Sequence, residues 1–338
     1  MRILVTGGAG YIGSHTCVVL LEAGHTVTVI DNLCNSSAIA LERVQELAGK
    51  PLRFVEGDIR NRADLDRVFE GGIDAVIHFA ALKAVGESCE QPLRYFDNNI
   101  GGTITLMQAM EAHGVQRLIF SSSATVYGQP DSVPIKENAP LRATNPYGRT
   151  KLVMEQLIQD WCAARPEVSA VLLRYFNPVG AHSSGRIGED PRGEPNNLMP
   201  YIAQVAVGKR EFLRIYGDDY PTPDGTGIRD YLHVVDLAVA HLKSLDYTAA
   251  HSGCEAFNLG TGRGYSVREM VNAFQIAAGR PVPSQVEDRR SGDVSELTAD
   301  PFEANARLSW HAKLELSAMC ADVWRWQQQN PNGFINEA

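Results

Sequence analysis

The chain has 338 residues, of which 44% are hydrophobic, and its formal net charge is −9. This length exceeds that of one small domain, and the apolar content is enough for a sizeable buried core. The acidic balance and the lack of a dense Lys/Arg run argue against nucleic acid or an anionic membrane as a partner. An acidic protein that binds an acidic ligand needs local cations at its site, so isolated arginines are of interest.

The sequence also indicates a cytoplasmic protein without a membrane anchor or a metal. Met1 and Arg2 run directly into an apolar segment, and no apolar stretch is long enough to span a bilayer. The six cysteines are scattered without C-x-x-C spacing, which argues against a metal site or a disulfide framework. We therefore expect reduced thiols in the cytoplasm.

The first residues predict a phosphate-binding turn between a strand and a helix. An apolar run at 3–5 is typical of a buried strand, and glycines follow at Gly7, Gly10 and Gly13 before a helical pattern begins. Gly7 would permit the turn, Gly10 would let the backbone approach a pyrophosphate, and Gly13 would let helix and strand pack closely. The pyrophosphate would bind free N–H groups at the helix N-terminus.

A second predicted strand, 26–30, ends at Asp31. Its carboxylate can hydrogen-bond the adenosine ribose and would repel a 2′-phosphate, which favours NAD over NADP. A glycine triplet alone fits a turn without any ligand equally well. The order of strand, turn, helix, strand and terminal acid makes that alternative much weaker.

Helices and strands alternate through the next part of the chain. Helices are expected over 38–47, 63–69, 93–113 and 147–164, and strands over 53–56, 75–79, 118–120 and 170–174. Six strands that alternate with helices predict an α/β fold with a doubly wound parallel sheet of Rossmann type. The helix over 147–164 has so wide an apolar face that it is expected to be buried on two sides, against the sheet and in a two-fold dimer. The alternative is burial within one subunit.

Two residues near predicted strand ends have both a structural and a ligand-binding interpretation. Asp58 could accept a hydrogen bond from adenine, but an Asp after Gly is also common in Asx turns and helix caps. His78 lies inside a predicted strand and is expected to be a core histidine with satisfied hydrogen bonds. The small residues after that strand, starting at Ala80, would let the backbone approach a cofactor.

The composition changes at about residue 176, where Pro, Gly, Asn and Asp become dense. Helices are expected over 198–207, 234–247, 267–278 and 314–328, and strands over 256–259 and 282–286. We therefore predict an NAD-binding domain over 1–175 and a smaller mixed α/β substrate domain over 176–338. Segment 234–259 is expected to return to the first domain.

The most specific chemical signal is the segment from Asn145 to Lys151. Pro146 suits the first turn of a helix, which puts Tyr147 and Lys151 on one face. A free tyrosine has a pKa of about 10 and is a weak base at neutral pH. A nearby ammonium and a nicotinamide cation would lower the pKa of Tyr147, which could then take a proton from a substrate hydroxyl. Such a pair also occurs by chance, so the upstream glycine turn makes it informative.

Ser123 is the third candidate catalytic residue. It ends a serine run after the predicted strand 118–120. Its hydroxyl could hold the substrate oxygen and relay a proton to Tyr147. At least one of Ser121 and Ser122 is expected instead to satisfy backbone groups at the strand end.

Together these motifs resemble the UDP-glucose 4-epimerase family of the extended short-chain dehydrogenase/reductase superfamily. The resemblance is carried by Gly7-x-x-Gly10-x-x-Gly13, Asp31-Asn32-Leu33, Ser123 to Gly128, Tyr147-x-x-x-Lys151, Arg174 to Gly180, Asn196 to Tyr201 and Gly227 to Tyr231. It covers essentially the whole chain and implies a cytoplasmic homodimer of galactose metabolism with tightly held NAD. Further cofactor contacts are then expected from Tyr11, Ile12, Asn32, Leu33, Cys34, Asn35, Ser36, Asp58, Ile59, Phe79, Ala80, Lys83, Asn98 and Phe176.

The second domain offers groups that suit a nucleotide sugar. Its candidate substrate residues are Asn177, Asn197, Leu198, Arg229, Arg290, Asp293 and Leu297. Arg229 and Arg290 suit a diphosphate, the two asparagines offer amides, and Asp293 could accept a ribose hydroxyl. Each of these polar residues could equally make local hydrogen bonds in a loop.

The resemblance implies reversible epimerisation of UDP-glucose and UDP-galactose at the 4-position through a 4-keto sugar. A 4,6-dehydratase is disfavoured because Ala124 and Thr125 stand where that family has an Asp-Glu pair. Leu297 stands where glucose-restricted members carry tyrosine, so a 4-epimerase of N-acetylated UDP-sugars is an alternative. A non-catalytic NAD-sensing protein is a further alternative, which the retained Ser123, Tyr147 and Lys151 argue against.

Overall fold

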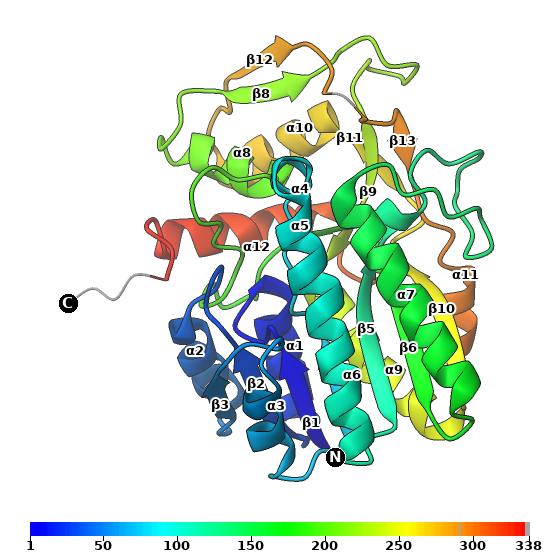
Figure 1. Ribbon diagram of the computed structural model, residues 1–338. Coiled ribbons are helices and arrows are strands. Elements are labelled where there is room, and N and C mark those ends of the chain that lie inside the picture. Colours follow the sequence, from blue (N-terminus) through cyan, green and yellow to red (C-terminus); the bar gives the residue numbers. More distant parts are fainter. Residues whose placement is uncertain (291, 335–338) are drawn as a thin grey trace.

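The computed structural model describes residues 1–290 and 292–334 and contains a seven-stranded parallel sheet (Figure 1). The strands are β1 (Arg2–Thr6), β2 (Thr26–Asp31), β3 (Arg53–Glu56), β4 (Ala75–His78), β5 (Arg117–Ser123), β6 (Ser169–Tyr175) and β10 (Gly253–Leu259). Their order in the sheet is β10-β6-β5-β4-β1-β2-β3, and all neighbours are parallel. The direction of strand succession reverses at β1, as in a doubly wound sheet. The predicted α/β Rossmann-type fold is confirmed.

Helices cover both faces of this sheet. They are α1 (Tyr11–Glu22), α2 (Ala38–Ala48), α3 (Arg62–Phe69), α6 (Gly102–Ala112), α7 (Pro146–Ala164) and α9 (Val234–Ala250). In β1, Ile3 and Val5 pack in the core formed with α1, α2 and α9, whereas Leu4 packs in the core formed with α3, α6 and α7. Successive strand side chains point to opposite faces. A continuous apolar run is therefore needed because both faces are covered.

The predicted helix over 93–113 is present as a continuous helical run, but it contains a π-helical turn. The run consists of α5 (Pro92–Tyr95), the π-helical turn η1 (Phe96–Gly101) and α6, and a short helix α4 (Val85–Glu90) precedes it. The amide of Asn99, within the π-helical turn, bonds the backbone N–H and C=O of Leu82 and the hydroxyl of Thr150. These inward contacts accompany the widened turn, and such turns are frequent at functional sites.

The second part of the chain forms a smaller lobe above the carboxyl ends of the sheet strands in Figure 1. Its elements are β7 (Asn177–Val179), α8 (Leu198–Ala206), β8 (Leu213–Tyr216), β9 (Ile228–His233), β11 (Gly264–Ser266), α10 (Val267–Ala278), β12 (Ser284–Glu287), β13 (Glu296–Leu297), α11 (Phe302–Arg307) and α12 (Leu316–Gln329). Strand β9 pairs with β7, β11 and β13, and β8 pairs with β12. A third apolar core joins α8, α10 and α12. Between these elements the chain returns to the large sheet, where β10 lies beside β6 and α9 packs on α1.

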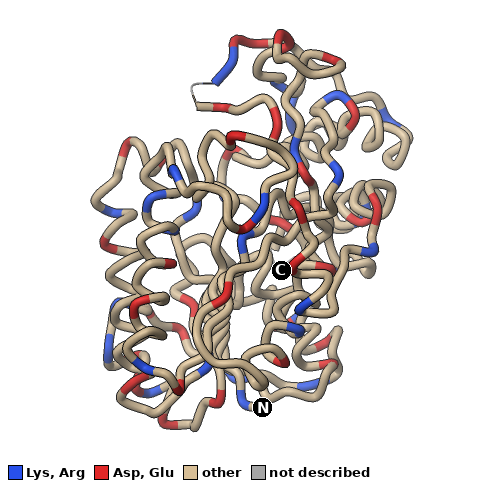
Figure 2. The backbone as a smooth tube through the Cα atoms, turned by 90° about the vertical axis from the view of Figure 1, so that its right-hand side faces the viewer, with Lys and Arg blue, Asp and Glu red and all other residues tan. Residues whose placement is uncertain are grey.

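Acidic and basic residues are interspersed along the backbone (Figure 2). Within residues 1–290 and 292–334, no helix combines the length and apolar character needed to cross a bilayer. The same part of the chain contains no group of three His, Cys, Asp or Glu residues arranged to hold a metal ion. All six cysteines are free thiols.

Candidate active site

The three glycines of the turn between β1 and α1 have different steric surroundings. Gly7 has a φ of 70°, and a Cβ there would lie 2.7 Å from the Ala80 nitrogen. A Cβ at Gly13 would lie 2.4 Å from the Gly7 oxygen, so the helix can approach the turn only without a side chain. A Cβ at Gly10 would meet only the Gly7 oxygen, at 3.3 Å. Gly10 therefore leaves an open side at the start of α1, which an added Cβ would fill.

This turn fits the pyrophosphate of a dinucleotide. Gly10 is the N-cap of α1 and supplies no side-chain hydrogen bond to the first turn. The N-terminal N–H groups of a helix favour an anion when no side chain caps them. The Tyr11 hydroxyl donates to the Gly180 carbonyl at 2.6 Å, which joins this turn to the smaller lobe.

Asp31, at the end of β2, organises the loop beside the turn. Its carboxylate accepts hydrogen bonds from the backbone of Ala9 (3.0 Å) and Leu33 (3.0 Å) and from the Ser36 hydroxyl (2.8 Å). These bonds hold the glycine turn and the loop 32–36 around one carboxylate. The sequence contained no signal for this organising role.

Asp58 takes the Asx-turn arrangement that was one of its two interpretations. Its carboxylate accepts from the backbone N–H of Arg60 at 2.8 Å, from the Arg60 side chain at 2.9 Å and from the Asn32 amide at 3.1 Å. The hydrogen bonds from Arg60 lower the pKa of Asp58 to about 2. The Asn32 contact links Asp58 to the loop that Asp31 holds.

The predicted tyrosine and lysine lie one turn apart at the start of α7. Asn145 caps this helix by accepting from the Gly148 N–H at 2.8 Å, and Pro146 occupies its first position. Lys151 is buried, and its Nζ donates to the Ser121 carbonyl at 2.6 Å. Its Nζ also lies 4.9 Å from the ring centroid of Phe120. Lys151 thus ties α7 to the end of β5.

The expectation that Lys151 lowers the pKa of Tyr147 is wrong for the protein's own groups. Burial raises the pKa of Tyr147 to about 12, and only a hydrogen bond with Ser123 opposes it. The Lys151 ammonium is directed at the Ser121 carbonyl. Burial also lowers the pKa of Lys151 to about 7, against an opposing effect of the Glu155 carboxylate. The protein therefore holds Tyr147 as a phenol.

The serine run at the end of β5 also differs from expectation. Ser121 hydrogen-bonds the Tyr175 hydroxyl, and Ser122 donates to the Glu155 carboxylate. The expectation that one of these hydroxyls satisfies strand-end backbone is therefore wrong, because buried partners on β6 and α7 lie within reach. Ser123 accepts from the Thr125 N–H at 3.2 Å, at the start of the short 3₁₀-helix Ala124–Val126.

His78 is a core residue, as predicted. Its Nδ1 lies 2.7 Å from the Thr6 hydroxyl, and its Nε2 lies 3.0 Å from the Thr103 hydroxyl. Burial lowers the pKa of His78 to about 3, so the ring is neutral.

Glu189 is a site residue that the sequence did not reveal. Its Oε1 lies 3.3 Å from Lys83 Nζ and accepts from the Asn197 amide at 2.7 Å. Glu189 is one of several acids in a glycine-rich loop, and no periodicity or spacing distinguishes it. Only the fold brings this carboxylate between a predicted cofactor residue and a predicted substrate residue. Asn98, another predicted cofactor residue, donates to its neighbour Asn99 at 3.0 Å.

Several candidate substrate residues meet around β9 and β13. Leu297 on β13 stands opposite Arg229 on β9, and Leu297 packs in the same apolar cluster as Phe176. The Arg229 guanidinium donates to the Ile228 carbonyl at 2.8 Å. Asn177 begins β7, which pairs with β9, and Leu198 begins α8.

Two of the candidate substrate residues, Arg290 and Asp293, form a charge pair. Arg290 lies 3.4 Å from Asp293, and its guanidinium covers the Tyr216 ring at 4.3 Å from the centroid. Ser291, within this segment, lies outside the described residues.

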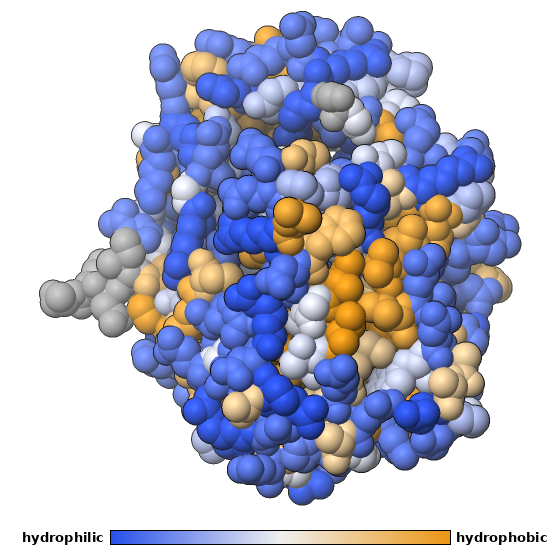
Figure 3. All heavy atoms as spheres, in the orientation of Figure 1, coloured by the Kyte–Doolittle hydropathy of each residue, from blue (hydrophilic) through white to orange (hydrophobic). Residues whose placement is uncertain are grey.

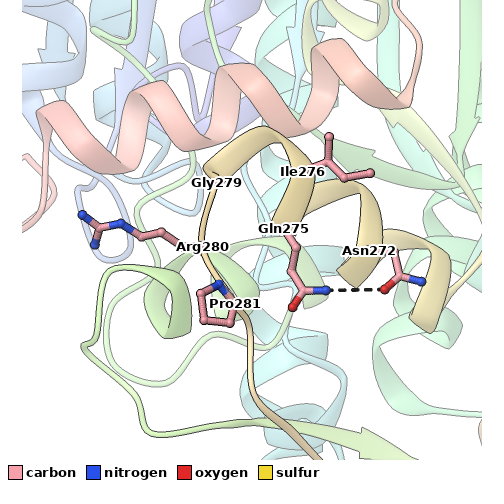
Figure 4. Close-up of a pocket in the computed structure, with 6 residues that line it drawn as sticks. All are labelled: Asn272, Gln275, Ile276, Gly279, Arg280 and Pro281. Carbon is pink, nitrogen blue, oxygen red and sulfur yellow. Dashed lines mark hydrogen bonds between the residues drawn. The ribbon is translucent and has the colours of Figure 1, made fainter.

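A surface depression of about 490 Å³ lies elsewhere, at the end of α10 (Figure 4). It is lined by Asn272, Gln275, Ile276, Gly279, Arg280 and Pro281. None of these residues belongs to the predicted site. A small cavity of about 10 Å³ lies instead beside the glycine turn, and Tyr11, Gly180 and Glu189 are among its lining residues.

The fold and this site define a Rossmann-type enzyme with a serine, a tyrosine and a lysine at the carboxyl edge of the sheet. The model of the NAD dependent epimerase/dehydratase family matches residues 3–260. The UDP-glucose 4-epimerase of Bacillus subtilis is 60% identical over 335 residues, which span 99% of each chain. The chain therefore belongs to the NAD-dependent epimerase/dehydratase family, and the resemblance predicted from its motifs is confirmed.

Solved structures agree with this assignment. The UDP-glucose 4-epimerase of Bifidobacterium longum, in complex with NAD⁺ and UDP, is 51% identical with a TM-score of 0.96, over 99% of this chain and 100% of that one. The enzyme of Stenotrophomonas maltophila, with bound NAD and formylated UDP-arabinopyranose, is 52% identical with a TM-score of 0.96, over 98% and 99%.

Proposed function

We propose that this protein interconverts UDP-glucose and UDP-galactose by epimerisation at carbon 4 of the sugar, with resident NAD. The observation that carries the proposal is the placement of Tyr147 one turn before the buried Lys151, on a helix that Lys151 ties to the end of β5, where Ser123 lies. The name of the Bacillus subtilis relative, which is 60% identical over 99% of each chain, supports the same activity.

The cofactor would be held by the glycine turn and by the edge of the sheet. Its proposed contacts are Gly7, Gly10, Tyr11, Ile12, Gly13, Asp31, Asn32, Leu33, Cys34, Asn35, Ser36, Asp58, Ile59, Phe79, Ala80, Lys83, Asn98, Ser123, Tyr147, Lys151 and Phe176. When bound, NAD supplies a reversible hydride acceptor. Asp31 favours NAD over a 2′-phosphorylated form because its carboxylate repels that group.

The chain's own residues move the proton and grip the nucleotide. Tyr147 takes the proton of the 4-hydroxyl, with Ser123 in the relay, and returns it after the 4-keto sugar has turned over. The protein holds Tyr147 as a phenol, so the positive charge that favours the phenolate has to come with the bound cofactor.

The substrate would bind in the smaller lobe, residues 176–338 without the returning segment 234–259. Asn177, Asn197, Leu198, Arg229, Arg290, Asp293 and Leu297 are the proposed contacts. Arg229 and Arg290 hold the diphosphate, and Asp293 accepts from the ribose. If the nucleotide is bound tightly and the hexose loosely, the 4-keto sugar can rotate and present its opposite face to the cofactor.

A two-fold homodimer through α6 and α7 is part of this proposal. An apolar patch occupies the middle of the face in Figure 3, over these helices. Leu93 on α5, Phe96 in η1 and Ile104 on α6 are exposed, Leu93 at 84%, and Val153 and Leu157 on α7 are partly exposed. A contiguous apolar patch of this kind is typical of a protein interface.

The test is an assay of the purified protein with UDP-galactose and no added nucleotide. We expect UDP-glucose to form, and NAD to be released when the protein is denatured. A stripped protein that turns over only while NADH accumulates would make it a net dehydrogenase. Bound NAD without turnover would favour an NAD-sensing protein. UDP-N-acetylgalactosamine, assayed beside UDP-galactose, tests the alternative substrate that Leu297 suggests.

A further inference from the structure

A buried ion pair lies behind the proposed catalytic residues and has no part in the proton transfer. Glu155 follows Lys151 by one turn of α7 and is fully buried. Its Oε1 and Oε2 accept from the Nε and Nη2 of Arg174 on β6, at 2.9 and 2.6 Å. Glu155 also accepts from the Ser122 hydroxyl on β5. One carboxylate thus joins α7 to the two strands beneath it.

The network continues past Arg174 to the next strand. Arg174 Nη1 donates to the Tyr127 hydroxyl at 3.0 Å and to the Glu137 carbonyl at 2.9 Å. The Tyr127 hydroxyl donates to the Asn258 side chain on β10 at 2.7 Å. A buried ion pair is weak evidence for stability, because desolvation offsets its Coulomb attraction. Its presence here calls for a role other than stability.

Two successive turns of α7 hold two successive residues of β5. Lys151 donates to the Ser121 carbonyl, and Glu155 accepts from the Ser122 hydroxyl. Residues four apart share one helical face, so both contacts act on the same side of α7. The next residue on β5 is Ser123. The Ser122–Glu155 bond therefore fixes the residue before Ser123 against the helix that presents Tyr147.

Glu155 also supplies the negative charge nearest to Lys151 along the helix. The titratable groups that interact electrostatically with Lys151 are Glu155 on α7 and His78 on β4. His78 is neutral, and Phe120 presents an apolar ring. Burial lowers the pKa of Lys151, and the negative charge of Glu155 opposes this effect.

We propose that Glu155 is a positioning residue, which through Ser122 holds the end of β5, and with it Ser123, against the helix that presents Tyr147. Its side chain is buried and contacts Ser122 and Arg174. The proposal rests on the proposed function for its effect on turnover, but its effect on Lys151 is independent of the reaction.

The experiment compares Glu155→Gln, Ser122→Ala and the control Ser244→Ala. Ser244 is buried on α9, where its hydroxyl donates to the Ala240 carbonyl, so the control also loses a buried hydroxyl. We would measure kcat and KM for UDP-galactose in the holoenzyme. We would also follow the titration of the Lys151 ¹⁵Nζ signal by NMR, assigned with Lys151→Arg.

In Glu155→Gln we expect kcat to fall by up to about 100-fold with little change in KM, because small displacements of catalytic groups cost that much. The Lys151 titration should move to lower pH because the carboxylate charge is lost. Ser122→Ala should lower kcat by about tenfold and leave the Lys151 titration nearly in place, because the Glu155–Arg174 pair remains. Ser244→Ala should match the parent in all three readouts.

An unshifted Lys151 titration in Glu155→Gln, with kcat no lower than in Ser244→Ala, overturns the proposal. If Glu155→Gln does not fold, Ser122→Ala decides, and a kcat equal to that of Ser244→Ala overturns the positioning role. A parent protein without UDP-galactose turnover refutes the proposed function instead. In that case the Lys151 titration still tests Glu155.

Discussion

The ammonium of Lys83 lies 3.3 Å from the carboxylate of Glu189, and this pair joins the two lobes of the molecule. The amide of Asn197 donates to the same carboxylate oxygen at 2.7 Å. Lys83, a proposed cofactor contact, and Asn197, a proposed substrate contact, therefore both bind the carboxylate of Glu189. A diphosphate that binds nearby has to compete with Glu189 for them.

Glu189→Gln should therefore increase the affinity for UDP. The amide keeps an oxygen for Asn197 but removes the charge that holds Lys83. A partly exposed ion pair of this kind contributes about 0.2–1 kcal/mol, so the gain is expected to be at most about fivefold. Calorimetric titration with UDP measures it, and Glu194→Gln, in the same loop, is the matched control. Unchanged or weaker UDP binding would show that Glu189 does not compete.

Tyr147→Phe should abolish most turnover while UDP still binds. In the proposed mechanism the phenol acts on the 4-hydroxyl proton, whereas the proposed nucleotide contacts lie in the smaller lobe. Loss of a general base costs about 10²–10⁴-fold in rate. Turnover of UDP-galactose and UDP affinity should be measured together, with Tyr265→Phe on β11 as the control. Turnover near that of the parent would remove Tyr147 from the mechanism.

Asp31→Ala should weaken cofactor retention. The substitution removes the acceptor for Ala9, Leu33 and Ser36, and hydrogen bonds to a charged group contribute about 1.5–3 kcal/mol each. Disorder of the loop 32–36 should lower NAD affinity at least about tenfold. The preference for NAD over NADP should also decrease, because the carboxylate that repels the 2′-phosphate is lost. The NAD content of the purified protein is the measurement. Glu56→Ala, at the exposed end of the neighbouring strand, should retain NAD, and equal NAD content in both variants would contradict the prediction.

His241→Phe should flatten the dependence of stability on acid pH. Burial lowers the pKa of His241 to about 4, and its Nε2 has no partner within the part of the chain that the structure describes. Between about pH 6.5 and 4 the unfolded chain binds a proton that the folded state does not, so the free energy of unfolding falls as pH falls. One such group contributes a slope of up to about 1.4 kcal/mol per pH unit.

Denaturant unfolding at pH 7, 6 and 5 measures this slope. The ring of His241 packs 4.7 Å from that of Phe79, so phenylalanine suits the site. Ser244→Ala, one turn along α9, removes a buried group that does not titrate and should keep the parent slope. An unchanged slope in His241→Phe would contradict the prediction.

Leu297→Tyr should suppress activity on N-acetylated sugars and spare the glucose reaction. Leu297 is partly buried beside Phe176 and opposite Arg229, and leucine leaves more room than tyrosine. Pocket changes of this size are worth about 1–3 kcal/mol, or roughly 10–200-fold. The ratio of rates with UDP-galactose and UDP-N-acetylgalactosamine measures the effect. An unchanged ratio means that Leu297 is not the gate, and Leu297→Met should leave the ratio near that of the parent.

Local patterns were sufficient for most elements of the large sheet. The continuous apolar run at β1 arises because both sheet faces are covered, and the glycine spacing reflects two steric contacts, at Gly7 and Gly13. Strand β3 and helix α10 were predicted with the bounds that the structure has. The short strands β7, β8 and β9 were missed, because strands of three to six residues with mixed polarity have no clear periodicity. The π-helical turn η1 was also missed, because inward contacts of Asn99 accompany it.

The sequence by itself determined the fold class and, through the resemblance of its motifs, the family. It also predicted the catalytic residues, because helix spacing puts Tyr147 and Lys151 on one face and parallel strands end at one edge. Only the tertiary structure decided the electrostatics. Burial, not the neighbouring ammonium, dominates the pKa of Tyr147, and Lys151 is directed at the Ser121 carbonyl. The partners of Glu155 and Glu189 lie 19 and 106 residues away in sequence, at Arg174 and Lys83, so no local pattern could reveal them.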